Sequence, residues 1–187
     1  MPSILSSFDT NLFLLINHLP HNYLFNSINL LFSAVGYFGI IFFVFSLPLL
    51  FLEERKDKRF VVYLLTAFIL VSVANSLFLK KLIKRSRPNT ALTETINVGN
   101  EDTGKNDYSF PSTHAAFAFA GAYILTREDK KRWKIWYLAA LFIAFSRIYL
   151  GKHYPLDIFG GAIVGTFLGW LSIKIGKRAG VANPGKK

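Results

Sequence analysis

Apolar residues in this chain gather into long blocks, and short polar or charged stretches separate each block from the next. A helix needs about 20 apolar residues to cross a bilayer. The blocks that fit this requirement best are residues 28–52, 60–79, 112–126, 133–150 and 157–175. The pattern therefore predicts an all-α fold, a polytopic transmembrane bundle of about five to six spans.

The N-terminal stretch 8–19 departs from this pattern. It is apolar but short, and Asp9, Asn11 and Asn17 interrupt it. An amphipathic helix lying in the membrane interface within residues 1–24 is the preferred interpretation. The alternative is that this helix extends in both directions and forms a sixth, polar membrane span.

Composition agrees with a membrane protein. The chain is 52% hydrophobic and 16% aromatic, with only 18% charged residues, fewer than a soluble domain of this length normally carries. We expect one membrane-embedded domain over residues 1–187, without a cleaved signal peptide. The chain has no cysteine, which excludes disulfides, thiol nucleophiles and thiolate metal sites.

The net charge of +11 has two interpretations. Nucleic-acid binding is one, but the cations flank apolar blocks and do not form one basic face. Anchoring at anionic lipid and recognition of an anionic substrate fit this arrangement better. We therefore expect the lipid bilayer and a membrane lipid as partners, and no nucleic acid; the sequence gives no indication of oligomeric state.

The basic loops predict an orientation. Residues 53–59, residues 127–134 and the tail 176–187 share one side if the chain crosses five times from residue 28. Their Lys and Arg residues place that side in the cytoplasm. The polar stretches within residues 80–157 then meet on the opposite side.

The first polar stretch runs from Lys80 to Pro88, with the sequence KKLIKRSRP. Lys80 and Arg87 would face nearly the same way on a helix, about two turns apart. Pro88 is expected to end that helix. Anchoring by cations that snorkel to the membrane surface is the alternative interpretation, but an anionic ligand explains Arg87 better.

The second stretch, from Pro111 to His114, has the sequence PSTH and opens an apolar block. Ser112 is a natural N-cap, and free backbone N–H groups at such a helix start can bind a phosphate oxygen. His114 would project from the first turn into the same site. A simple capping sequence is the alternative.

The third stretch, from Ser146 to Asp157, carries the strongest signal. Arg147 lies inside an apolar block, where a charge is costly and usually functional. His153 and Asp157 are four residues apart, so a helix starting near Pro155 brings the carboxylate to the imidazole. Such a carboxylate fixes the tautomer of a nucleophilic histidine. The alternative is a structural ion pair between Arg147 and Asp157.

Metal chemistry is not expected. Two histidines among cations repel a divalent ion, and no cluster of carboxylates offsets those cations. His18 and His21 lie in the N-terminal stretch, away from evident partners, and are interpreted as interfacial. We therefore predict no metal and no cofactor.

These three stretches, which cover residues 80–157, resemble the signature of the type 2 phosphatidic acid phosphatase family. Its pattern is Lys-x6-Arg-Pro, Pro-Ser-x-His and Ser-Arg-x5-His-x3-Asp, and each fixed position is present in order. The resemblance implies a metal-independent lipid phosphatase. Thr113 stands where the family most often has glycine, which puts the fit of the substrate in question.

The resemblance also implies roles for the site residues. His153 would attack phosphorus and form a phosphohistidine, Asp157 would orient it, and His114 would act as general acid. The remaining residues would bind the phosphate: Lys80, Arg87, Ser112, Thr113 and Arg147.

In size, the chain resembles the bacterial phosphatases of lipid A, undecaprenyl diphosphate or phosphatidylglycerophosphate. The resemblance implies a lipid substrate of this kind and a site at the outer face of the bacterial inner membrane. The additional cations Lys81, Lys84, Arg85 and Lys152 favour a multiply charged head group, such as lipid A 1-phosphate or undecaprenyl diphosphate. A lipid phosphotransferase using the same phosphohistidine is one alternative. A membrane scaffold or transporter without catalysis is another.

Overall fold

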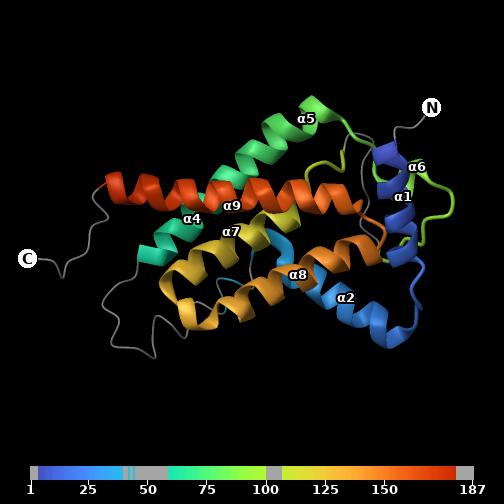
Figure 1. The fold of residues 1–187 in the computed structure, drawn as a ribbon, viewed down its shortest axis with the longest axis horizontal. Coiled ribbons are helices and arrows are strands. Elements are labelled where there is room, and N and C mark those ends of the chain that lie inside the picture. Colours follow the sequence, from blue (N-terminus) through green and yellow to red (C-terminus); the bar gives the residue numbers. More distant parts are fainter. Residues whose placement is uncertain (1–3, 40–41, 43, 45–58, 100–106, 180–187) are drawn as a thin grey trace, which may run out of the picture.

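The computed structural model describes residues 4–39, 42, 44, 59–99 and 107–179 of the chain, and every regular element in these ranges is a helix (Figure 1). This confirms the all-α class. The α-helices are α1 (Ile4–Asn17), α2 (Tyr23–Gly36), α4 (Arg59–Val73), α5 (Lys80–Ile83), α6 (Pro88–Ala91), α7 (Thr113–Glu128), α8 (Trp133–Tyr149) and α9 (Pro155–Arg178). Two 3₁₀ turns, η1 (Tyr37–Gly39) and η3 (Lys130–Arg132), and a π-helical segment, η2 (Ala74–Leu79), complete the order.

Several predicted spans are present as helices. In the described part of the chain, two helical stretches are long and apolar enough to cross a membrane, 59–91 and Pro155–Arg178. Helices α7 and α8 have 16 and 17 residues, slightly fewer than a full crossing needs. Most of the predicted span 28–52 beyond α2, the loop 53–58 and the tail from 180 lie outside the described residues. The number of spans therefore stays a prediction.

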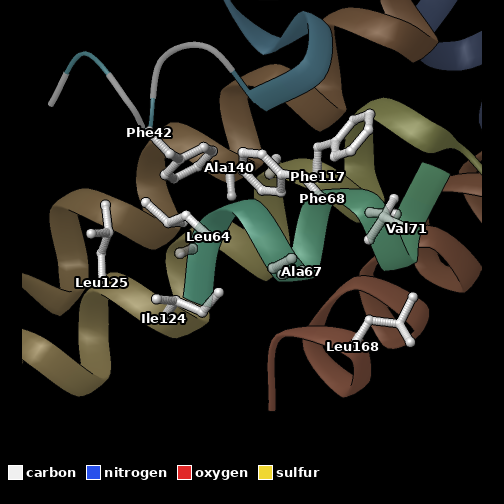
Figure 2. Close-up of a cluster of buried hydrophobic side chains, with 14 of the residues drawn as sticks. Phe42, Leu64, Ala67, Phe68, Val71, Phe117, Ile124, Leu125, Ala140 and Leu168 are labelled. Carbon is white, nitrogen blue, oxygen red and sulfur yellow. The ribbon is translucent and has the colours of Figure 1, made fainter. Parts of the chain in front are cut away.

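The apolar core forms where α4, α7, α8 and α9 pack together (Figure 2). Helix α7 is central, and nine of its residues are buried because it contacts α4, α8 and α9. Leu64, Ala67 and Val71 of α4 and Ile124 of α7 are fully buried in this core. The core holds the helices whose ends carry the polar stretches.

Small residues bring α7 and α9 into backbone contact. A Cβ atom on Gly165 would lie 2.1 Å from the carbonyl oxygen of Ala116, and one on Gly161 would lie 2.5 Å from that of Ser112. Such close approach is how small residues join helices in lipid. It fixes the start of α7 beside the start of α9, where the backbone N–H of Ser112 donates to the carbonyl of Asp157.

Helix α1 turns polar side chains toward the protein. Asp9 and Asn17 are buried, as is Phe13 between them, whereas Leu5 and Phe8 are exposed. The Asn17 amide donates to the carbonyls of Ile96 and Tyr149 and accepts from the Ile96 N–H. The polar residues of this helix thus bind the bundle; its position in the membrane interface stays a prediction.

Candidate active site

A cavity of about 260 Å³ brings residues of all three polar stretches together. Its lining residues come from η1, the η2–α5 segment, the start of α7, the end of α8 and the α8–α9 connection. In Figure 1, α8 and α9 join at the end of the bundle where α1 and α6 also lie. The lining residues are Tyr37, Ser76, Lys80, Arg87, Asp107, Thr113, His114, Phe117, Arg147 and His153. The predicted convergence of the three stretches is confirmed.

The local path around Arg87 differs from the prediction. The helix carrying Lys80 ends at Ile83, and Lys84 adopts a left-handed conformation with φ 50°. Arg87 lies beyond this turn in extended backbone, and Pro88 is the first residue of α6. The expectation that Pro88 ends the Lys80 helix is therefore wrong. Proline is well suited to a helix start because its missing N–H has no partner there anyway.

Asp107 connects the two cations of the first stretch. Its carboxylate accepts from Lys80 Nζ at 2.9 Å and from Arg87 Nη2 at 2.8 Å. Burial alone raises the pKa of Asp107, but the hydrogen bond from Lys80 and the charge of Arg87 outweigh it, so the net pKa is lowered. An ionised carboxylate thus pairs with the same two cations that the sequence predicts will bind the phosphate group of the substrate. No sequence pattern marked Asp107.

The start of α7 matches its prediction in part. Ser112 is the N-cap, and its hydroxyl accepts from the Ala115 N–H. Ser112 is fully buried and does not line the cavity, whereas Thr113 and His114 do. The Thr113 hydroxyl accepts from the amide of Asn75, which the π-helical segment directs toward this helix start.

The end of α8 holds His153 in place. The carbonyl oxygen of Arg147 accepts from the N–H groups of both Lys152 and His153. Gly151 makes the tight turn possible with φ +79°, and a Cβ atom there would lie 2.7 Å from the Ile96 carbonyl oxygen. The Arg147 guanidinium donates to the Ser33 hydroxyl of α2 while lining the cavity.

The two ring nitrogens of His153 face opposite groups. Nε2 lies 3.3 Å from Arg87 Nη1, and Nδ1 lies 3.5 Å from Asp157 Oδ2. Because arginine can only donate, Nε2 accepts and the ring proton belongs on Nδ1, toward the carboxylate. The predicted pairing of His153 with Asp157 is present in the geometry.

Burial keeps His153 neutral. The side chain is 2% exposed, and burial lowers the pKa of His153 well below its ordinary value. The charges of Arg87, Arg147 and Lys80 lower it further, while Asp107 opposes them. A neutral imidazole with its lone pair on Nε2 is a competent nucleophile at neutral pH.

Two cations that the sequence assigns to the head group face inward instead. Arg85 pairs with Asp157 and Asp9. Lys152 is 1% exposed and donates to the side-chain oxygen of Asn97 at 2.8 Å. The head-group prediction is therefore wrong for both, although Lys81 and Lys84 are exposed.

The two N-terminal histidines also have partners. His18 contacts the Glu94 carbonyl, and His21 stacks on Tyr149 and contacts Asn26. The expectation that they lack partners is wrong. Neither histidine lines the cavity. That His18 and His21 take no part in catalysis stays a prediction.

The site thus combines a cationic cavity, two histidines and a carboxylate behind one of them, within an apolar helical bundle. The model of the PAP2 superfamily matches residues 59–180. The chain therefore belongs to the PAP2 superfamily, and it is an enzyme of the lipid phosphatase type.

Particular relatives agree with this membership. The chain is 30% identical to an undecaprenyl-diphosphatase of Sulfolobus acidocaldarius over 90% of its length and 78% of the relative. It is 31% identical to a lipid A 4'-phosphatase of Bacteroides thetaiotaomicron, over 67% of this chain and 59% of that protein. The crystal structure of Aquifex aeolicus LpxE is similar with a TM-score of 0.68 and 28% identity, covering 89% of this chain and 95% of that one.

Proposed function

We propose that this protein releases phosphate from a lipid phosphomonoester or diphosphate through a phosphohistidine on His153. One observation carries the proposal: His153 Nε2 accepts from a cavity cation while Nδ1 faces a buried carboxylate. This arrangement gives a neutral nucleophile beside an anion-binding cavity, which is the requirement for covalent phosphoryl transfer.

In the first step, Nε2 of His153 attacks phosphorus and an N–P bond forms. The bond from phosphorus to the lipid oxygen breaks, and His114 gives its proton to that oxygen. Asp157 stabilises the positive charge that develops on the ring. Lys80, Arg87 and Arg147, with the Thr113 backbone, hold the phosphoryl oxygens, while Ser112 caps the helix that presents Thr113.

In the second step, water attacks the phosphohistidine. His114 takes a proton from that water, the new P–O bond forms, and the N–P bond breaks. Inorganic phosphate leaves, and His153 returns to its neutral form. Apart from the water, both steps use groups of this chain, and the cations around the cavity supply the positive charge that stabilises the phosphoryl oxygens.

The proposed substrate carries its phosphate at the membrane surface and its tail in the bilayer. The cavity lies at one end of the apolar helices, as such a substrate requires. The two relatives act, by their names, on undecaprenyl diphosphate and on lipid A. We place undecaprenyl diphosphate and lipid A phosphates first, phosphatidylglycerophosphate next, and the site on the outer face of a bacterial inner membrane.

A phosphate-release panel tests this assignment. Purified protein is assayed with undecaprenyl diphosphate, lipid A, phosphatidylglycerophosphate and phosphatidate, with and without EDTA. We expect release from at least one of the first two at a rate that EDTA leaves unchanged. Loss of activity with EDTA would contradict the metal-independent mechanism. The absence of phosphate release from all four lipids would contradict the proposed substrate class.

Asp107→Asn is expected to tighten anion binding. The Asp107 carboxylate forms ion pairs with Lys80 and Arg87, so a bound phosphate must replace Asp107 as the partner of these two cations. A partly exposed ion pair is worth up to about 1 kcal/mol, which corresponds to about a fivefold lower inhibition constant for orthovanadate. Asp129→Asn, which removes the distant ion pair with Arg132, is the matched control and should change nothing. Weaker vanadate inhibition in Asp107→Asn would show that Asp107 supports the anion site.

A further inference from the structure

The carboxylate behind His153 is itself held from a distant part of the chain. Arg85 Nη1 donates to Asp157 Oδ1 at 2.8 Å, and Arg85 Nη2 donates to Asp9 Oδ2 at 2.5 Å. The second oxygen of Asp9 accepts from the Leu156 N–H at 2.9 Å. Asp9 of α1 thus contacts both the arginine that grips Asp157 and the first turn of the helix that carries Asp157.

The two carboxylates of this network are buried, and Arg85 between them is partly exposed. The side chains of Asp9 and Asp157 are 0% exposed. The Arg85 guanidinium lies 4.0 Å from the centre of the Tyr154 ring, and Tyr154 packs edge-on against Phe13 of α1. The Arg85 carbonyl accepts from the Ser109 N–H. The arginine is therefore fixed through its backbone, its ring contact and both its terminal nitrogens.

Charge explains why two carboxylates share this arginine. If Arg85 paired with Asp157 alone, the pair would be neutral and Asp157 would stabilise a positive imidazole less. Asp9 accepts one of these two guanidinium hydrogen bonds, so the charge of Arg85 is shared between two carboxylates and does not neutralise Asp157 alone. A buried charge is costly unless it is paired and hydrogen-bonded, and the network meets that condition for both carboxylates.

We infer that Asp9 and Arg85 are positioning residues that act through Asp157 on His153. The inference rests on the proposed function, because it assigns these residues to the same phosphohistidine chemistry. It also gives the N-terminal helix a part in the active site, in addition to any contact with the membrane interface. Asp9 does not line the cavity, so it affects the rate without touching the substrate.

The test uses full-length protein with undecaprenyl diphosphate as the substrate. Asp9→Asn keeps the shape of the side chain and an acceptor for Leu156 but removes the charge shared with Arg85. We expect kcat to fall about tenfold or more with KM changed less than about twofold, the signature of an interaction made in the transition state. Asn11→Ala, an exposed change on the same helix, should retain wild-type kcat.

A double-mutant comparison separates positioning from general destabilisation. Asp9→Asn is made in wild-type protein and in Asp157→Asn protein. If Asp9 acts through Asp157, the second background shows no further loss of kcat. Equal losses in both backgrounds would overturn the inference. Arg85→Lys keeps the charge but cannot bridge both carboxylates in a fork. We expect a similar loss of kcat in this variant, and it replaces Asp9→Asn as the test if Asp9→Asn does not fold.

The outcomes also distinguish this inference from the proposed function. Wild-type activity that His153→Ala abolishes, together with a wild-type kcat in both Asp9→Asn and Arg85→Lys, would overturn the positioning role alone. Full phosphate release by His153→Ala would overturn the proposed function itself, whatever the Asp9 variant does.

Discussion

His153→Ala is expected to lower kcat for phosphate release by more than about 10³-fold, because the substitution removes the atom that attacks phosphorus. KM should change far less, since Lys80, Arg87 and Arg147 remain to bind the phosphate. The melting temperature should fall modestly, because the ring is buried and accepts from Arg87, while the backbone bonds that hold residue 153 remain. Rates over a range of lipid concentrations, with a thermal melt, measure all three quantities.

His18→Ala is the matched control for this prediction. It removes the same side chain from a residue that contacts a backbone carbonyl away from the cavity. We expect kcat within about twofold of wild type for this variant. A kcat for His153→Ala that remains comparable to that of His18→Ala would exclude His153 as the nucleophile.

Gly165→Leu is expected to prevent α7 and α9 from packing. Even the first carbon of the new side chain would lie 2.1 Å from the Ala116 carbonyl oxygen, and a backbone atom cannot move aside as a flexible side chain can. Overpacking usually costs about 1–3 kcal/mol, and this backbone clash should exceed that range. Because the starts of these two helices build the site, yield of folded protein and activity should fall together.

Gly169→Ala provides a graded comparison. Its Cβ atom would lie 3.1 Å from the Ala120 carbonyl oxygen, a close contact that a small helix shift relieves. We expect a lower melting temperature for this variant but retained kcat. A Gly165→Leu protein that melts at the wild-type temperature would contradict the packing of these helices described above.

Periodicity and block length were sufficient to predict most of the helices. The starts of α7 and α8 follow from a capping serine after Pro111 and from the apolar run that begins at Trp133, and both were found close to the expected positions. The turn after Ile83 was missed, because a left-handed Lys84 has no signature in side-chain pattern. The sequence also does not predict that Asp9 and Asn17 of α1 face the protein interior. A polar residue in a short apolar helix can either face water or bind a buried partner, and the pattern is the same in both cases.

Motif spacing located the cavity residues better than it located their partners. His153 and Asp157 are neighbours because four residues span one helical turn, which sequence alone shows. Asp9 and Asp107 reach the site through tertiary contacts, with Asp9 lying 147 positions from Leu156 in the chain. Such long-range contacts depend on how the helices pack, so neither carboxylate could be assigned from the sequence.

The most direct test of the central claim is the identification of the phosphorylated residue. Purified protein is mixed with lipid labelled at the phosphorus, quenched in alkaline detergent within one turnover, and digested for peptide mapping. We expect acid-labile, base-stable label on the peptide containing His153, and none in His153→Ala. Label on any other residue would contradict the account.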